Sequence, residues 1–408
     1  AGIASVTSSV TSPSFVGAVT GNVTGNVTGN VTGDATGLSG NPSINTTGIV
    51  TATSFIPTTG QLSHRNIVVN GAMQVIQRGS STVAGAHNSF AVDRFKFKKE
   101  STAANFNMTQ STTSPDGFSK SLKVDCTSAD TSTAHNEFVM VRYSIEAQDL
   151  QQLGYGTSGA KPLVLSFYVR SSLTGTYSIN CLQQDNSSKI YSRTYTINSA
   201  NTWERKTISI PADTSGVIND DNGEGLQFNF NLVLGSSFKG SAVSTAWETY
   251  ANDKWGSQHG INLASSTSNE WYLTGVQLEV GSVATPFEHR SYADELRRCQ
   301  RYFIRIPDQN ASSGYYFLAQ GAGHDNNAFL CNFHFPTTMR SNPSLTTTGS
   351  LRAYNGGTVT ISSIILNTSS VAGACLQIAV SSGISPKDAV SLGQNNDSDA
   401  GVQFNAEL

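Results

Sequence analysis

Charged residues are scarce in this sequence. Only 13% of its 408 residues are Asp, Glu, Lys or Arg, about half of the roughly 25% usual for soluble domains. The formal net charge is −3, so the chain lacks the basic surplus of proteins that bind nucleic acid or anionic membranes. We therefore expect no nucleic-acid partner.

Long apolar runs are also missing. No stretch approaches the roughly 20 apolar residues that a transmembrane helix requires, so we expect no membrane insertion. Ser, Thr, Asn and Gly take the place of the missing charges, and helix formers are sparse. Short runs of Val, Ile, Thr, Phe and Tyr alternate with clusters of Gly, Asn, Asp and Ser, a pattern typical of β-rich proteins.

Cysteine is rare and irregularly spaced. The five cysteines include no C-x-x-C and no paired spacing, which argues against a disulfide framework and a zinc site. We predict buried free thiols that act as small apolar side chains. They are Cys126, Cys181, Cys299, Cys331 and Cys375.

Motifs for catalysis and cofactor binding are missing as well. Neither G-x-S-x-G nor H-E-x-x-H occurs, so no motif indicates a hydrolase nucleophile or a zinc protease. The stretch GYGTSG at 154–159 fits G-x-G-x-x-G, but a helix-like segment precedes it and a strand-like run follows. The dinucleotide fingerprint needs the reverse order. We therefore predict a glycine-rich turn, no cofactor, no catalytic residue and no enzyme.

The densest acidic stretch is NDDNGEG, residues 219–225. Paired carboxylates can serve glycoside hydrolysis, and oxygen-rich clusters can bind calcium. A solvated turn is the simpler interpretation, because the spacing matches no familiar calcium loop. The candidate calcium ligands are Asp220, Asp221 and Glu224.

Two stretches mix aromatic residues with amide and acidic side chains. They are AWETYANDKW and GYYFLAQGAGHDNN. Aromatic rings can pack on the C–H faces of sugars while nearby polar groups bond the hydroxyls. The alternative is that these aromatics belong to a core or to contacts between chains. The candidate glycan or receptor contacts are Trp247, Tyr250, Trp255, Tyr315, Tyr316, His324, Asp325 and Asn326.

Strand-like runs fill most of the chain after residue 63. Between 64 and 290 about ten of them are separated by turn signals, which predicts a β-sandwich or jelly roll. They include NIVVN, DRFKFKK, SLKVDC, FVMVRYSI, LVLSFYV and LQFNFNLVL. Residues 304–408 continue with YYFLA, AFLCNFHF, TVTISSIIL and ACLQIAV. The predicted fold class is all-β.

One segment, residues 291–303, changes to helical spacing. Ser291 and Asp294 form a capping box of the S-x-x-D kind. An apolar stripe follows at steps of four, three and four residues. The stripe either faces two symmetry mates or packs on its own sandwich. It consists of Tyr292, Leu296, Cys299 and Phe303, of which the last three are trimerisation candidates.

Residues 1–63 carry the tetrapeptide repeat VTGNVTGNVTGNVTG. In an extended strand, valine and glycine share one face, and threonine and asparagine share the other. Such a strand needs partners for its apolar face, so we predict a shaft of several chains, either intertwined strands or a triangular β-helix. A disordered linker is the alternative. The trimerisation candidates here are Val19, Val23, Val27 and Val31.

Several segments together resemble the carbohydrate-binding-module-like jelly roll of bacteriophage tail fibres. The resemblance covers residues 64–408, with the motifs in the expected order, and the leading repeats also look like phage fibre shafts. The matching segments are NIVVNGAMQVIQRG, FAVDRFKF, IEAQDLQQLGYGTSGAKPLVLSFYVRSS, TWERKTISIP, LTGVQLEVGSVATPFEHRSYADELRRCQRYF, FPTTMRSNPSL and FNAEL.

The resemblance implies a virion protein, usually a homotrimer, that projects from the phage tail. Its N-terminal side would join the tail, baseplate or an adaptor protein, and it would bind a glycan or other receptor on the host surface. A tailspike enzyme that degrades surface polysaccharide and a bacterial adhesin are the alternatives.

The same resemblance suggests a division into four parts. They are a shaft at 1–63, a jelly roll at 64–290, a connecting helix at 291–303 and a β tip at 304–408. Gln77, Arg78, Asp93 and Arg94 belong to the opening motif, in which we predict Asp93 and Arg94 to form a structural pair.

Overall fold

A computed structural model describes residues 63–78, 82–185, 188–240, 242–308 and 314–408. The repeat, with Val19, Val23, Val27 and Val31, lies outside the described residues, so the shaft stays a prediction. Across the described ranges, no helix has both the length and the apolar character needed to cross a membrane. The predicted all-β fold class is confirmed.

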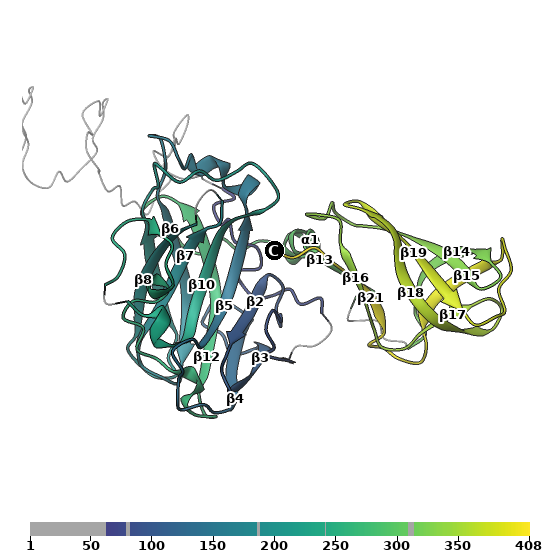
Figure 1. The fold of residues 1–408 in the computed structure, drawn as a ribbon, viewed down its shortest axis with the longest axis horizontal. Helices are drawn as coiled ribbons and strands as arrows, with labels where there is room; N and C mark the ends of the chain where they lie inside the picture. The colour runs from purple at the N-terminus through teal and green to yellow at the C-terminus, as the bar shows by residue number, and fades with distance from the viewer. Residues whose placement is uncertain (1–62, 79–81, 186–187, 241, 309–313) are drawn as a thin grey trace, which may run out of the picture. The chain divides into compact units, whose positions relative to one another are not determined.

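Two six-stranded antiparallel sheets form a β-sandwich (Figure 1). The first sheet has the order β1 (Thr82–Ala84), β3 (Asn105–Ser111), β4 (Ser121–Ser128), β12 (Glu270–Val280), β6 (Leu163–Ser171) and β9 (Glu204–Ile210). The second has the order β11 (Glu248–Thr249), β8 (Lys189–Ile197), β7 (Gly175–Gln183), β10 (Glu224–Leu234), β5 (Phe138–Glu146) and β2 (Phe95–Glu100).

Alternating side chains build the core between these sheets. In β4, Leu122, Val124 and Cys126 are buried, while the residues between them are only partly buried, as the two-residue period of a strand requires. The rings of Phe167 and Phe230 meet edge to face with centroids 5.2 Å apart. The predicted β-sandwich is confirmed.

The sequence motif NIVVN does not form a strand. The side chain of Asn66 takes the place of a backbone partner here. Its Oδ1 accepts hydrogen bonds from the backbone N–H groups of Val68 and Leu278, at 3.0 and 3.1 Å. The segment is therefore fastened to β12 as an extended loop, although Val68 is buried as its sequence suggests.

Short 3-10 helices interrupt the strands. They are η1 (Ala147–Leu153), η2 (Ser236–Phe238), η3 (Asn252–Lys254) and η4 (Leu263–Ser265). The motif GYGTSG lies between η1 and β6, with left-handed backbone at Gly154 (φ 59°) and Gly156 (φ 84°). Its interpretation as a turn is confirmed, since glycine adopts this region without steric cost.

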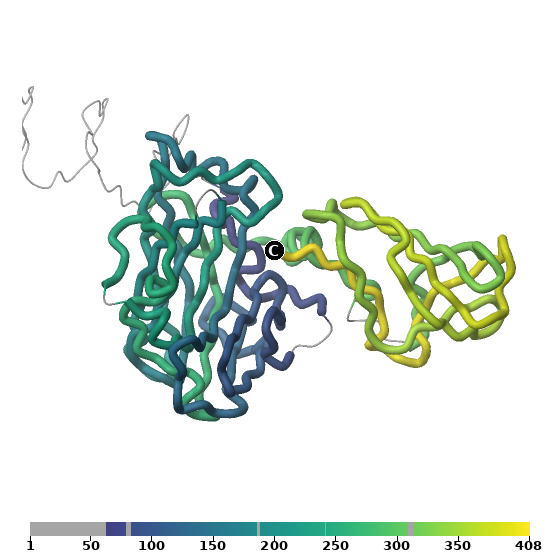
Figure 2. Tube along the Cα trace, in the orientation of Figure 1, coloured from purple at the N-terminus to yellow at the C-terminus, as the bar shows by residue number. Residues whose placement is uncertain are grey.

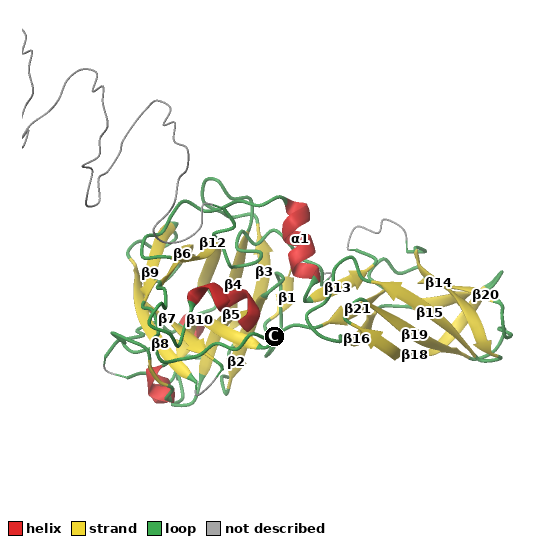
Figure 3. Cartoon of the chain, turned by 90° about the horizontal axis from the view of Figure 1, so that it is seen from above, coloured by secondary structure: helices red, strands yellow, loops and turns green. Residues whose placement is uncertain are grey.

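The helix α1 (Tyr292–Gln300) follows the sandwich (Figure 3). Ser291 caps it, because its Oγ accepts from the backbone N–H of Asp294 at 3.2 Å, so the predicted N-terminal cap is confirmed. Cys299 and Phe303 are buried within their own chain. Their assignment to a trimer contact is therefore wrong, whereas Leu296 is only half-buried and its assignment stays a prediction.

The rest of the chain forms a small sheet and a closed barrel (Figure 3). The sheet has the order β13 (Phe303–Ile306), β21 (Gly401–Asn405) and β16 (Ser344–Thr348). The barrel runs through β14 (Phe317–Asp325), β15 (Ala328–His334), β19 (Gly373–Val380), β18 (Thr358–Ser370), β17 (Leu351–Tyr354) and β20 (Ala389–Gln394). Phe329, Leu376, Ile378 and Leu392 fill its core.

A buried ionic network joins the sandwich to the last residues of the sequence. Arg78 bonds the carboxylates of Asp93 and Glu407, both at 2.9 Å, and Arg94 also pairs with Glu407. Figure 2 shows these last residues, in yellow, beside the green segment around α1, where Ala406 N donates to Tyr302 O at 2.8 Å.

The predicted pair of Asp93 with Arg94 is therefore wrong. Each side chain has another partner, since Asp93 pairs with Arg78 and Arg94 pairs with Glu407. The guanidinium of Arg94 lies 3.4 Å from the ring centroid of Tyr302, and that of Arg78 lies 3.9 Å from the centroid of Phe303. These residues of the opening motif are structural.

The substitution Asp93→Asn should change how stability depends on pH. Burial raises the pKa of Asp93 from 3.8 to about 6, against the opposing charge of Arg78. Its stabilising contribution is thus present below about pH 4 and is lost as pH rises through 6. Through this group, the unfolding free energy of the wild type should fall by up to about 3 kcal/mol between about pH 4 and 7. The variant should lack this fall, because asparagine does not titrate. Urea denaturation at both pH values measures this, and identical pH slopes would contradict it.

Candidate functional site

The first predicted aromatic stretch is packed rather than presented to solvent. Trp255 is buried between Phe138 and Phe238, with ring centroids at 5.4 and 4.9 Å. Its indole N–H donates to the hydroxyl of Tyr250 at 3.0 Å. The assignment of Trp255 to ligand contact is therefore wrong, because its ring completes a small core on the outer face of the second sheet.

Trp247 and Tyr250 are also engaged in packing. Trp247 packs against the main sandwich core, and its indole N–H donates to Pro211 O at 2.8 Å. Tyr250 is half-buried beside the small core that contains Trp255. These two residues and Trp255 do not form an exposed aromatic surface.

The acidic stretch does not assemble a metal site. Asp221 Oδ1 accepts from the backbone N–H of Gly223 at 2.8 Å, and Glu224 accepts from the hydroxyl of Ser144. Within the described ranges, no group of three or more His, Cys, Asp or Glu side chains is placed to hold a metal ion. The structure therefore adds no support for Asp220, Asp221 and Glu224 as calcium ligands, and the stretch forms a bend that leads into β10.

The cysteines are free. Burial raises the pKa of the thiols of Cys126, Cys181, Cys299 and Cys331, which keeps them protonated at neutral pH. The prediction of buried free thiols is confirmed for these four, whereas Cys375 is half-buried on the barrel.

The second predicted aromatic stretch is divided by a strand. Tyr315 and Tyr316 precede β14, whereas His324 and Asp325 end it and Asn326 follows in the turn. The nine residues of β14 span roughly 27 Å at about 3.3 Å per residue. The five residues therefore cannot contact one small ligand together.

The tyrosine end of β14 forms an exposed aromatic surface. Tyr315, Phe317 and Tyr354 are 49%, 46% and 37% exposed. Their ring centroids lie 4.9, 5.6 and 5.4 Å from the guanidinium carbon of Arg352. We call these four residues the aromatic platform. Tyr316, at 51% exposure, lies next to it in sequence.

Strand register explains how the platform assembles. Phe317 in β14 pairs with Gly393 in β20, and Gly393 pairs in turn with Arg352 in β17. A Cβ atom on Gly393 would lie 2.9 Å from Phe317 Cδ1, so glycine leaves room for the phenylalanine ring. That ring reaches Tyr354 with a centroid separation of 5.7 Å. Sequence analysis missed Phe317, Arg352 and Tyr354, because only the register brings them together.

Polar groups surround the platform. Arg352 Nη1 donates to Thr358 Oγ1 at 3.0 Å. Asn355, next to Tyr354, donates to Asp388 Oδ2 at 3.1 Å. The arrangement can stack a flat ligand on aromatic rings while amide, hydroxyl and guanidinium groups bond its edge.

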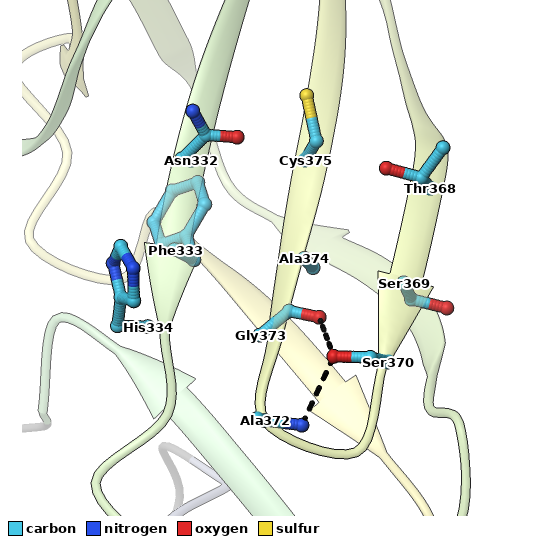
Figure 4. Close-up of a pocket in the computed structure, with 10 residues that line it drawn as sticks. All are labelled: Asn332, Phe333, His334, Thr368, Ser369, Ser370, Ala372, Gly373, Ala374 and Cys375. Atoms are coloured by element: carbon cyan, nitrogen blue, oxygen red, sulfur yellow. Dashed lines mark hydrogen bonds between the residues drawn. The ribbon is translucent and has the colours of Figure 1, made fainter.

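A second feature of the barrel is a polar trough of about 500 Å³ (Figure 4). Two cross-strand rows line it, Asn332–Cys375–Thr368 and His334–Gly373–Ser370. The middle strand, β19, contributes Gly373, which has no side chain, and Cys375, whose side chain is small. The hollow lies over these two residues, between the larger side chains of β15 and β18. Ser370 Oγ accepts from Ala372 N at 3.2 Å. The trough offers hydrogen bonds, and its lining residues include no exposed Phe, Tyr or Trp ring.

No family model matches this chain, and no curated protein does. The similar solved structures include the enzymatically active domain of tailspike protein 4 from bacteriophage CBA120, at 13% identity and a TM-score of 0.27. That match covers 53% of this chain and 21% of the solved domain, so this chain spans about a fifth of that domain's length.

Two other similar structures are smaller. A putative sugar binding protein from Bacteroides thetaiotaomicron has 10% identity and a TM-score of 0.28, with 53% of this chain and 100% of that chain covered. A family 11 carbohydrate-binding module from Clostridium thermocellum, in complex with a β-1,3-1,4-mixed-linked tetrasaccharide, has 13% identity and a TM-score of 0.24, with coverages of 50% and 96%. These scores assign no family and no ligand.

Proposed function

We propose that this chain is an adhesion protein that binds a cell-surface saccharide through the aromatic platform. One observation carries the proposal. Tyr315, Tyr316, Phe317 and Tyr354 are four of the eight large apolar side chains that are exposed in the described residues. A folded protein seldom exposes such a group without a ligand or partner.

The platform suits a sugar in its chemistry. Ring faces can cover the C–H side of a pyranose. The guanidinium of Arg352, beside the rings, and the hydroxyl of Thr358, which accepts from it, can bond sugar hydroxyls. Stacking on the rings depends little on surface charge, which salt screens. Binding by stacking and hydrogen bonds at one shallow surface is expected to be weak for a single site.

We further propose that the protein is a bacteriophage tail fibre. The tail-fibre-like motifs along residues 64–408 and the VTGN repeat support this setting. A homotrimer attached to the tail on its N-terminal side would present three platforms, and linked weak sites can gain about 10²- to 10⁴-fold in avidity. Light scattering tests the trimer, and a mass near the 43.2 kDa of one chain would contradict it.

Affinity electrophoresis through gels that contain bacterial surface polysaccharides tests the proposed function. We expect at least one polysaccharide to retard the full chain, because each polymer offers many sugar rings to the platform. Gels with an inert polymer serve as the control. If the protein adheres to host cells but no surface polysaccharide retards it, and protease treatment of the cells abolishes adhesion, the receptor is a protein and the proposal fails.

A further inference from the structure

The guanidinium of Arg352 lies at the centre of the platform. Three aromatic ring centroids surround its carbon atom at 4.9 to 5.6 Å. Cation–π contact favours a charged group in this position. The residue is half-buried rather than enclosed, so a ligand stacked on the rings would lie beside a positive charge.

Four arginines of the described residues are paired with carboxylates. Arg78 and Arg94 share Glu407, Arg290 pairs with Glu295 at 2.8 Å, and Arg301 pairs with Glu146 at 2.6 Å. Arg352 belongs to the larger group of described arginines with no carboxylate within 4.0 Å. Its distinguishing feature is the three aromatic rings around it, beside which an unpaired charge remains.

The hydrogen bonding of Arg352 is also incomplete. Nη1 donates to the hydroxyl of Thr358, a neutral acceptor, and Nε is buried with no partner in the described residues. A guanidinium has five N–H donors in a planar fork, which matches a carboxylate or phosphate group. The platform thus combines stacking surfaces with an anion-binding group that no carboxylate of the described chain occupies.

A nearby acidic side chain is already engaged. Asp388 accepts from Asn355 Nδ2 at 3.1 Å and from the backbone N–H of Ser385 at 2.8 Å. Its carboxylate therefore belongs to the turn before β20 and is not paired with Arg352.

We propose that the platform selects an acidic saccharide, whose carboxylate or phosphate group pairs with Arg352 while its sugar ring stacks on Phe317 and Tyr354. The inference rests on the proposed function, since it names the class of saccharide that the same surface binds. A charge-assisted hydrogen bond in a partly desolvated site typically changes affinity by about 10- to 100-fold.

The test compares matched pairs of polysaccharides on the full-length protein. One pair is a uronate-containing polymer and its carboxyl-reduced neutral form; the other is a phosphate-containing polymer and its dephosphorylated form. We expect wild type to bind one acidic member about 10- to 100-fold more tightly than its neutral counterpart. The pair that shows the preference identifies the anionic group, and added salt should reduce the preference.

Variants at Arg352 connect the preference to this residue. Arg352→Gln should abolish the preference while retaining binding of the neutral form, and Arg352→Lys should restore part of it. The control is Arg170→Gln, because Arg170 also lies over a tyrosine, 4.8 Å from the ring centroid of Tyr272, but on the sandwich. Unfolding midpoints of all variants report their folding.

Two kinds of failure are distinguishable. Equal binding of acidic and neutral forms by wild type, or a preference that survives in folded Arg352→Gln, would overturn the inference and leave saccharide binding intact. Absence of binding to every polysaccharide would overturn the proposed function and this inference with it.

Discussion

Replacing Glu407 with alanine should lower the free energy of unfolding by about 3–5 kcal/mol, the usual effect of breaking a buried ion pair. The Glu407 side chain is only 6% exposed and bonds both Arg78 and Arg94. Its removal leaves the buried guanidinium of Arg94 without an anion and leaves Arg78 with Asp93 alone. Urea or guanidinium denaturation measures the loss.

The pKa of Glu407 supports this expectation. Burial alone would raise it, but Arg94 and Arg78 hold it below its usual value of 4.5. The carboxylate is therefore charged at neutral pH, and its stabilising contribution is lost as pH falls through the lowered pKa. The effect of Glu407→Ala should thus be larger at neutral pH than in acid.

Glu248→Ala is the matched control, because Glu248 pairs with Lys254 and both side chains are about one-third exposed. A pair of this kind should contribute less than about 1 kcal/mol. Similar small losses for Glu407→Ala and Glu248→Ala would show that the network does not stabilise the fold.

The double substitution Phe317→Ala with Tyr354→Ala should weaken saccharide binding by at least about 10²-fold, because truncating a central aromatic contact commonly costs about 2 kcal/mol. The rings touch each other and Arg352, so the double variant removes both stacking faces. Isothermal titration with the polysaccharide retained in the gels measures the change.

The stability of the double variant should fall only modestly, since both rings are more than one-third exposed. Tyr292→Ala is the matched control, because Tyr292 is 55% exposed on α1, outside the barrel. If the double variant still binds the saccharide, or if Tyr292→Ala loses binding equally, the platform is not the saccharide-binding surface.

Local patterns in the sequence are sufficient for many elements of this fold, although NIVVN is an exception. The alternation in SLKVDC predicts β4, and Ser291 with Asp294 predicts the start of α1. Both signals are short-range, because they depend on strand periodicity and on one capping hydrogen bond. The all-β class follows from many such segments.

The long-range arrangement has no comparable local signal. Trp255 is flanked by polar residues and looks exposed in sequence, yet its segment folds onto the outer face of the second sheet. Asp93 and Arg94 are neighbours in sequence, but their partners are Arg78 and Glu407. Such pairings depend on how distant segments meet, which periodicity does not encode.

The candidate site shows the same limit. Tyr315 and Tyr316 are conspicuous in sequence as an aromatic pair after the stretch Ser-Ser-Gly. Arg352 and Tyr354 join Phe317 only because Gly393 stands between them in the register of three strands. A sequence pattern can thus nominate one edge of the platform, whereas its centre depends on strand pairing.

The most direct test of the central claim is a crystal structure of the full chain with an oligosaccharide derived from the retained polysaccharide. The account predicts a sugar ring stacked on Phe317 and Tyr354, with polar contacts to Arg352. A sugar bound on the sandwich or in the polar trough, with the platform empty, would contradict it.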